Sequence, residues 1–327
     1  MRRVQKFNKI GISQFFQLSF NVELARRLPI PILKFYMYFW GLIYVLIRLQ
    51  LCKNIAACLF YIYRTSLIPS PFLLNWLRSI LGVFEHYFEK MVMAYKSLDE
   101  LQDYLNKRLL ISNRHFLDEL ASKGKGAILV TGHFGAVEYL PLSLAMNGYK
   151  VAMICKFKTQ TLKKALMEKA AQFGVQLIDA SEPGVAFKAL RAIKEGRFLI
   201  TECDEFSEWR FHKTQRVTVF GKVLPRDRTL DFFFKKAKVP TFLTLMKRDG
   251  NRFNMVVEFL SDGIKHDSIS AKAWKKLEEY ICAYPFQWYQ IKGTAKFLKT
   301  NAIEVSIEAQ KDNHIPDKDT VFSPSYS

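Results

Sequence analysis

The chain is poor in cysteine, and its cysteines form no recognisable disulfide or metal pattern. The five cysteines are odd in number and include no CxxC pair, which does not support a disulfide framework. We interpret them as reduced thiols in or facing a cytosol, most of them simply buried. The sequence has no zinc-ligand spacing, no internal repeat and no low-complexity tract. We therefore expect no metal and no cofactor.

Acidic residues are scarce relative to basic ones. Thirty Asp and Glu stand against 49 Lys and Arg, which gives a formal net charge of +19. Such a charge implies a polyanionic partner, either nucleic acid or an anionic membrane with a phosphorylated lipid. The aromatic-rich N-terminal segment favours the membrane, and no nucleic-acid-binding signature supports the alternative. We expect an anionic membrane and a phosphorylated lipid as partners, and no nucleic acid; the sequence specifies no oligomeric state.

Hydrophobic runs long enough to cross a membrane are also rare. A mean hydropathy of -0.02 argues against many spans. Residues 28–47 hold a single charge, Lys34, close enough to the start for its ammonium to reach headgroups. We predict one span there, with a monotopic anchor as the competing interpretation. Basic residues flank both ends, so the positive-inside rule gives no orientation. Residues 54–63 are too short to cross alone.

Beyond residue 65 the hydrophobic pattern is first helical, over 72–93 and 98–120, and then alternates between short apolar runs and helical segments. The alternation predicts an α/β fold with a mixed, largely parallel sheet flanked by helices, after an N-terminal membrane-associated helical segment. Expected strands are 127–131, 151–155, 175–178, 198–201, 217–220, 241–246 and 254–259. Expected helices are 137–147, 161–173, 184–195, 229–238 and 270–283.

The segment from Thr131 to Glu138 carries the first candidate chemistry. It follows a buried strand, and Pro141 fits only the first turn of the next helix, which leaves His133 and Gly135 on the connecting loop. His133 would then stand at the carboxyl end of a strand, where open α/β folds place their sites.

His133 and Glu138 are a candidate general base and orienting carboxylate. On one continuous helix five residues would separate them by about 140°, too far to meet. A loop permits His133 to fold back so that Glu138 accepts a hydrogen bond from one ring nitrogen, leaving the other to take a proton. The alternative is a surface histidine and an unrelated first-turn glutamate favoured by the helix dipole.

Four blocks of this chain resemble one family. They are ILVTGHFGAVE at 128–138, GRFLITECD at 196–204, VFG at 219–221 and YPFQWY at 284–289. In this order they are similar to the His-Phe-Gly-Asn-Trp-Glu, Asp-Gln, Phe-Phe-Gly and Pro-Glu-Gln-Trp-Tyr blocks of bacterial lipid A biosynthesis (lauroyl/myristoyl-type) acyltransferases, within the lysophospholipid acyltransferase superfamily. The resemblance covers most of the chain.

The resemblance implies acyl transfer from a thioester, on acyl carrier protein or acyl-CoA, to a hydroxyl of a lipid A-like or other glycolipid or phospholipid acceptor. His133 would be the base and Glu138 its orienter, with no covalent intermediate. Backbone N–H groups near Gly135 are candidate oxyanion donors. The expected location is the bacterial cytoplasmic (inner) membrane, with the catalytic domain facing the cytoplasm. We divide the chain into a basic, membrane-anchoring segment (1–64), the catalytic domain (65–310) and a disordered polar tail (311–327).

The chain departs from the family pattern at several positions. Ala136 and Val137 replace Asn-Trp, and Glu205 stands where Gln usually follows the Asp. Lys156 and Lys169 lie roughly where the family tends to carry arginines, and would bind acceptor phosphates as point charges. The alternative for this basic run is a solvated helix face.

Asp204 follows a second strand end, within an acidic run that also includes Glu202, Glu205 and Glu208. It is expected to orient the acceptor or a cation, or else to belong to a solvated loop cluster that counters nearby basic residues. Two other functions remain open at this stage. One is a thioesterase-like hydrolase that uses the same His and Glu, and the other is a catalytically silent lipid-binding membrane protein.

Overall fold

The structure is a computed structural model that describes residues 12–66, 68, 70–264 and 268–299. Its centre is a sheet of seven strands in the order β1-β9-β8-β2-β5-β3-β4. All neighbours in this sheet run parallel except β8 and β9, which are antiparallel. The predicted mixed, largely parallel α/β sheet is therefore confirmed. The predicted tail, 311–327, lies outside the described residues.

Apart from β1, the strands of this sheet lie close to the expected positions. They are β1 (Leu109–Ile111), β2 (Ala127–Thr131), β3 (Val151–Cys155), β4 (Gln176–Asp179), β5 (Phe198–Glu202), β8 (Thr241–Asp249) and β9 (Arg252–Ser261). Every residue of β2 is buried, as expected of a central parallel strand covered on both faces. A separate hairpin is formed by β6 (Phe211–Val219) and β7 (Lys222–Asp227).

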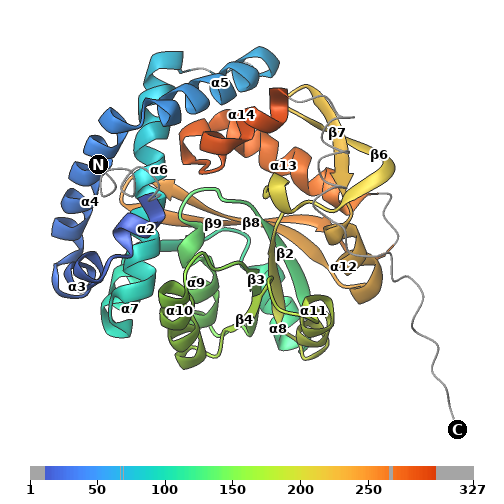
Figure 1. The fold of residues 1–327 in the computed structure, drawn as a ribbon. Coiled ribbons are helices and arrows are strands. Elements are labelled where there is room, and N and C mark those ends of the chain that lie inside the picture. The colour runs from blue at the N-terminus through green and yellow to red at the C-terminus, as the bar shows by residue number, and fades with distance from the viewer. Residues whose placement is uncertain (1–11, 67, 69, 265–267, 300–327) are drawn as a thin grey trace, which may run out of the picture.

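Helices flank this sheet. They are α8 (His115–Ser122), α9 (Leu140–Met146), α10 (Gln160–Gln172), α11 (Val185–Lys194), α12 (Thr229–Ala237), α13 (Ile269–Ala283) and α14 (Ile291–Lys299). In Figure 1, α13 and α14 lie above the strands and α8 to α11 below them. The five helices predicted after residue 130 are all present, except that the first begins with a 3-10 turn, Val137–Tyr139.

Two strands were not predicted. The helical pattern over 98–120 is broken into α7 (Leu98–Asn106), β1 and α8, because the three-residue β1 is too short to show an alternating pattern and adds to the sheet by pairing with β9. The strand β7 contains Pro225, which argues against a central strand; it is tolerated because β7 belongs to a two-stranded hairpin.

The N-terminal helices pack on the sheet domain. They are α2 (Ile12–Phe16), α3 (Ser19–Arg27), α4 (Ile30–Ile47), α5 (Leu49–Thr65) and the long α6 (Phe72–Tyr95). Figure 1 shows α4 at the outer edge with α6 between it and the sheet. By length and composition α4 alone among the described helices qualifies as a membrane span.

One buried ion pair ties α6 to the sheet. The Glu89 side chain is 1% exposed, and the guanidinium of Arg248 on β8 contacts both of its carboxylate oxygens, at 2.6 and 2.8 Å. The same guanidinium donates to the carbonyl of Gly135 at 2.8 Å. Arg248 therefore also holds the loop that follows β2.

Replacing Arg248 is expected to destabilise the fold strongly. Arg248→Ala leaves Glu89 buried without its partner, which costs about 3–5 kcal/mol of the free energy of unfolding. Burial already raises the pKa of Glu89 to about 7, so the variant carboxyl takes up a proton and the loss grows as pH rises above that value. Urea denaturation at two pH values measures both effects. Arg252→Ala, at an exposed position, is the control and should change stability by less than about 0.5 kcal/mol; equal losses in the two variants would contradict this role.

Candidate active site

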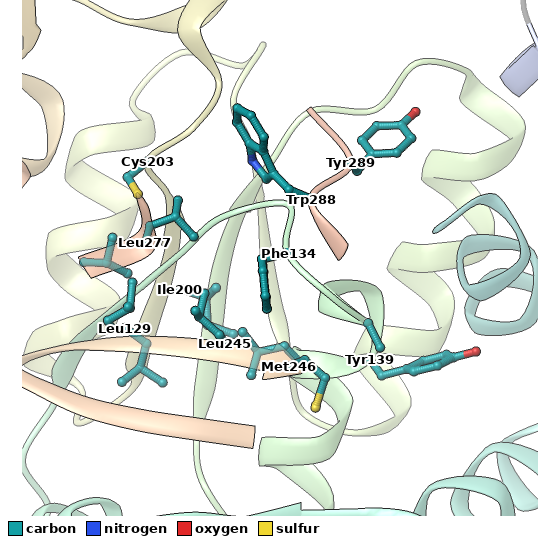
Figure 2. Packing of buried hydrophobic residues seen from close by; sticks show 14 of the residues in the cluster. Leu129, Phe134, Tyr139, Ile200, Cys203, Leu245, Met246, Leu277, Trp288 and Tyr289 are labelled. Atoms are coloured by element: carbon teal, nitrogen blue, oxygen red, sulfur yellow. The ribbon is translucent and has the colours of Figure 1, made fainter. Parts of the chain in front are cut away.

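The loop after β2 is held in one conformation by close backbone packing. A side chain at Gly135 would overlap the carbonyl of Met246, and Gly135 has a φ of +61°, so glycine is required here. The His133 carbonyl accepts from Tyr289 N–H, and Gly135 N–H donates to the Gln287 carbonyl, each at 2.8 Å. Figure 2 shows the Phe134 ring below this loop, between Trp288 and Met246. The C-terminal block at 284–289 thus forms part of the site.

His133 pairs with Asp204. The carboxylate is fully buried, with Oδ1 at 3.0 Å from His133 Nδ1 and Oδ2 accepting from the His133 backbone N–H at 2.8 Å. Trp288 Nε1–H also donates to Oδ2, at 2.8 Å. The sheet register explains the meeting, because Thr131 of β2 pairs with Glu202 of β5, and His133 and Asp204 each lie two residues further along adjacent parallel strands.

The contact with Asp204 sets the tautomer of His133. The amide nitrogen of Gln290 lies 3.4 Å from the same Nδ1, but an ionised carboxylate at 3.0 Å only accepts hydrogen bonds. Nδ1 therefore carries the hydrogen, and Nε2 of the neutral ring is free to take a proton.

Two further carboxylates surround Nε2. Glu202 Oε1 lies 3.5 Å from it and Glu205 Oε1 3.8 Å. Burial lowers the pKa of His133, but the negative charges of Glu202, Asp204 and Glu205 outweigh burial and raise that pKa to about 9. Burial also raises the pKa of Glu202, against the opposing effect of His133.

The predicted hydrogen bond between His133 and Glu138 is wrong. Glu138 lies on the 3-10 turn beyond the loop, and its Oε1 is 2.8 Å from Lys90 Nζ and 3.2 Å from His86 Nε2, both on α6. His86 stacks on Tyr289 with ring centroids 3.8 Å apart, and its own ring centroid lies 6.0 Å from that of His133. Asp204 occupies the position that the sequence interpretation gave to Glu138.

The predicted phosphate ligands and oxyanion donor are otherwise engaged. Lys156 is exposed and pairs with Glu208 at 2.8 Å. Lys169 is buried, donates to the Lys96 carbonyl, and burial lowers its pKa to about 8. The N–H of Gly135 already donates to Gln287. Among the described contacts, none joins Lys156 or Lys169 to His133, and the Gly135 N–H, although on the same loop as His133, is already used.

Other lysines gather near the histidine. Lys292 Nζ lies 3.3 Å from the ring centroid of Tyr289 and donates to Tyr87 Oη at 3.1 Å. Burial and the positive charges of Lys158 and Lys90 lower the pKa of Lys292. Lys90 pairs with Glu138, whereas within the described part of the chain no carboxylate lies at ion-pair distance from Lys158 or Lys292. Such a group of cations attracts an anion.

Two cavities adjoin this cluster. A groove of about 1700 Å³ passes Glu202 and Glu205 and continues along the β6–β7 hairpin to α12, with polar and apolar walls. A small cavity of about 80 Å³ begins at Glu138 and is otherwise almost entirely apolar. Its walls are Met93, Pro141, Leu142, Met153, Cys155, Phe157, Leu166, Ala170, Phe173, Val175 and Leu177, with Lys169 also at its edge.

His133, Glu202 and Glu205 also have the composition of a cation site. They offer one nitrogen and two carboxylate oxygens within 4.8 Å of one another, a donor set that suits a divalent transition metal. Occupancy would engage Nε2 of His133, so metal binding and proton acceptance exclude each other here.

Several residues of the site have no distinct sequence signal. His86, Lys90 and Lys292 lie on helices with many other polar residues, and only their contacts show that they face the site. Trp288 does have a sequence signal, because it belongs to the block at 284–289. In the structure its indole N–H donates a hydrogen bond to Asp204.

A loop histidine held by a buried aspartate at the carboxyl ends of parallel strands is an arrangement that suits a general base in an α/β enzyme fold. The model of the bacterial lipid A biosynthesis acyltransferase family matches residues 80–293. The match spans about two thirds of the chain and includes His133, Glu138, Asp204 and Trp288. The protein therefore belongs to the bacterial lipid A biosynthesis acyltransferase family. No curated protein matches the sequence.

His133 is expected to titrate well above the ordinary histidine pKa of about 6.5, near pH 9. Glu202→Gln removes the nearest charge to Nε2 and should lower the pKa of His133, and Glu205→Gln should lower it less. NMR of histidine-labelled protein measures the titration, with the His133 signal assigned by its loss in His133→Gln. Glu208→Gln, which alters an exposed carboxylate paired with Lys156, should leave it unchanged. A wild-type titration at or below 6.5 would contradict the carboxylate effect.

Proposed function

We propose that this protein transfers a fatty acyl chain from a thioester, on acyl carrier protein or coenzyme A, to a hydroxyl of a lipid A-like acceptor at the bacterial inner membrane, with its active site on the cytoplasmic side. Membership of the acyltransferase family supports acyl transfer at the coarse level. The observation that carries the proposal is the pairing of His133 with Asp204 beside the large groove.

In the proposed reaction, neutral Nε2 of His133 accepts the proton of the acceptor hydroxyl as the oxygen attacks the thioester carbonyl. Asp204 holds Nδ1–H and stabilises the imidazolium that forms. When the tetrahedral intermediate collapses, the C–S bond breaks and the imidazolium returns the proton to the departing thiolate. The acyl group moves directly from sulfur to oxygen without a covalent enzyme intermediate. The proton moves from the acceptor hydroxyl through His133 to the released thiol.

The carboxylates around Nε2 also affect the protonation state of His133 before the reaction. The raised pKa of His133 keeps the free enzyme largely protonated at neutral pH, so the base must first lose its proton. The carboxylates of Glu202 and Glu205 lie beside Nε2, and both residues line the large groove. In the proposal they accept hydrogen bonds from acceptor hydroxyls and orient the attacking one.

We assign the small apolar cavity to a few methylene groups of the acyl chain, because its volume of about 80 Å³ is smaller than that of a cavity that holds one benzene ring. Its walls are almost entirely hydrocarbon, sulfur and aromatic groups, and it starts at Glu138, which belongs to the cluster around the histidine. Burying methylene groups in such a cavity contributes about 0.8 kcal/mol for each. We assign Lys158 and Lys292 to an acceptor phosphate, in place of Lys156 and Lys169, because they lack a carboxylate partner in the described structure and lie near the site.

The test of the proposed function is a product assay with purified protein in lipid-detergent micelles. Acyl carrier protein thioester and acyl-CoA are supplied separately, with and without a lipid A-type acceptor, and the products are identified by mass spectrometry. Acceptor-dependent formation of an acylated lipid is expected. Equal thiol release without acceptor would instead show a hydrolase, and no turnover of either donor would favour a lipid-binding protein.

Asp204→Asn and Glu138→Gln distinguish the two possible orienting carboxylates. Asp204→Asn removes the acceptor that fixes the tautomer of His133 and is expected to lower kcat by about 10²–10⁴-fold. Glu138→Gln alters the contact with Lys90 and His86 and should lower kcat by less than about 10-fold, because it leaves the tautomer intact. Initial rates at saturating substrate measure both, with thermal unfolding as the folding control. The reverse order would return the orienting role to Glu138.

Lys292→Met should raise the KM for a phosphorylated acceptor by roughly 10-fold, the effect of losing one charge-assisted hydrogen bond. The substitution keeps the packing over Tyr289 and removes the ammonium. Lys156→Met, at an exposed site paired with Glu208, is the matched control and should leave the KM unchanged. An acceptor without phosphate should not distinguish Lys292→Met from wild type. A uniform change with both acceptors would contradict phosphate binding.

A further inference from the structure

Both ends of α4 are tied to α6, near opposite ends of that helix. Before α4, the carbonyl of Arg26 accepts from the buried ammonium of Lys96 at 3.3 Å, and Phe16 packs against Tyr87 of α6 with ring centroids 6.2 Å apart. After α4, the carbonyl of Cys52 on α5 accepts from Trp76 of α6 at 3.0 Å. α5 also packs along α14 of the sheet domain.

The inner face of α4 is itself occupied by protein. Leu33, Met37 and Gly41 are its buried residues, and Gly41 lies so close to the Phe84 ring that a Cβ would come within 2.6 Å of it. Lys34 Nζ contacts Glu85 of α6 at 2.7 Å. Because Glu89 of α6 is bound by Arg248 of β8, α6 is part of the sheet domain, and α4 packs along it.

The outer face of α4 is apolar, and none of the described residues covers it. Ile32, Phe35, Phe39, Leu42 and Leu46 recur at intervals of three and four residues and are 51–75% exposed. We call these five residues the apolar face. The neighbouring helices α3, α5 and α6 also carry exposed apolar side chains: Phe20, Leu49, Phe60, Leu73, Leu77 and Leu81. An exposed surface of this kind marks a membrane or protein contact.

The charge on the helices around it is mostly positive. From the start of α2 to the end of α6, residues 12–95, the chain has eight Lys and Arg and three acidic residues, Glu23, Glu85 and Glu89. A second copy of this chain would bring the same excess of positive charge to the contact, which opposes self-association. Anionic phospholipid headgroups complement it.

We infer that the apolar face docks on an anionic phospholipid bilayer with α4 lying in the plane of the interface, so that both ends of α4 remain on the side of the membrane that holds the catalytic domain. At about 1.5 Å per residue, the 18 residues of α4 are almost long enough to cross. A spanning α4 would place α3 and α5 on opposite sides of the bilayer, but both helices pack against α6 of the same domain. A monotopic anchor is therefore compatible with the structure and a span is not. This inference does not depend on the proposed acyl transfer.

The first test labels single introduced cysteines on either side of α4. Ser19→Cys and Gln50→Cys are exposed positions before and after the helix. Sealed membrane vesicles containing the full chain are treated with a membrane-impermeant maleimide, and labelling is measured by mass, with the parent chain as the background for the native cysteines. Both positions should be labelled from the same side. Labelling from opposite sides shows a span and overturns the inference.

The second test measures binding to lipid vesicles. Phe35→Glu combined with Leu42→Glu should reduce co-sedimentation with phosphatidylglycerol vesicles at least tenfold, and added salt should weaken the wild-type binding. Phe187→Glu is the control, since Phe187 is 72% exposed on α11 and far from α4 in sequence; it should bind like wild type. Unchanged binding by the double variant would overturn the inference. A wild-type dimer in detergent that only the double variant dissociates would also overturn it, because the face would then bind a second copy.

Discussion

The carboxylate of Asp204 is the constraint around which the site is organised. It is fully buried, and a buried ionised group needs hydrogen bonds to replace those of water. Three donors from two distant segments supply them: the backbone and ring of His133, and the indole of Trp288. This one requirement fixes the loop after β2, the end of β5 and the C-terminal block relative to one another, and it sets the tautomer of the histidine.

The local features of this site were predictable from the sequence, and its pairing was not. The ends of β2 and β5 were predicted closely, so His133 and Asp204 were each placed correctly at a strand end. The sequence interpretation then sought a partner for the histidine five residues away, whereas the partner lies 71 residues along the chain. Only the adjacency and register of the two strands bring the residues together, and a single sequence does not specify strand order.

A single sequence also does not show which lysines lie near the site. Lys156 and Lys169 stand out in the sequence as part of a basic run, yet one faces solvent and the other is buried against the carbonyl of Lys96. Lys90 on α6 and Lys292 on α14 are far apart in the sequence, and tertiary packing brings Lys292 against Tyr87 of α6. Composition alone gives α4 the properties of both a membrane span and an interfacial anchor. A choice between the two requires the tertiary contacts of its neighbouring helices.

Helix α6 connects the two functional surfaces. One of its faces holds α4 through Phe84 and Glu85, and the next turns carry His86, Glu89 and Lys90 toward Glu138 and Arg248. Since Arg248 also binds the carbonyl of Gly135, the histidine loop and the apolar face belong to one rigid frame. An enzyme that acts on a lipid hydroxyl benefits from such a frame, because the bilayer and the base then keep a constant separation.

The central claim is that His133, held by Asp204, is the base for acyl transfer to a lipid. Mass spectrometry of lipids from cells that express either the wild-type chain or His133→Ala at equal levels tests it most directly. One lipid class should gain the mass of a single acyl group only in cells that express the wild-type protein. The same lipid profile with both chains, or an acylated lipid formed equally by His133→Ala, would contradict it.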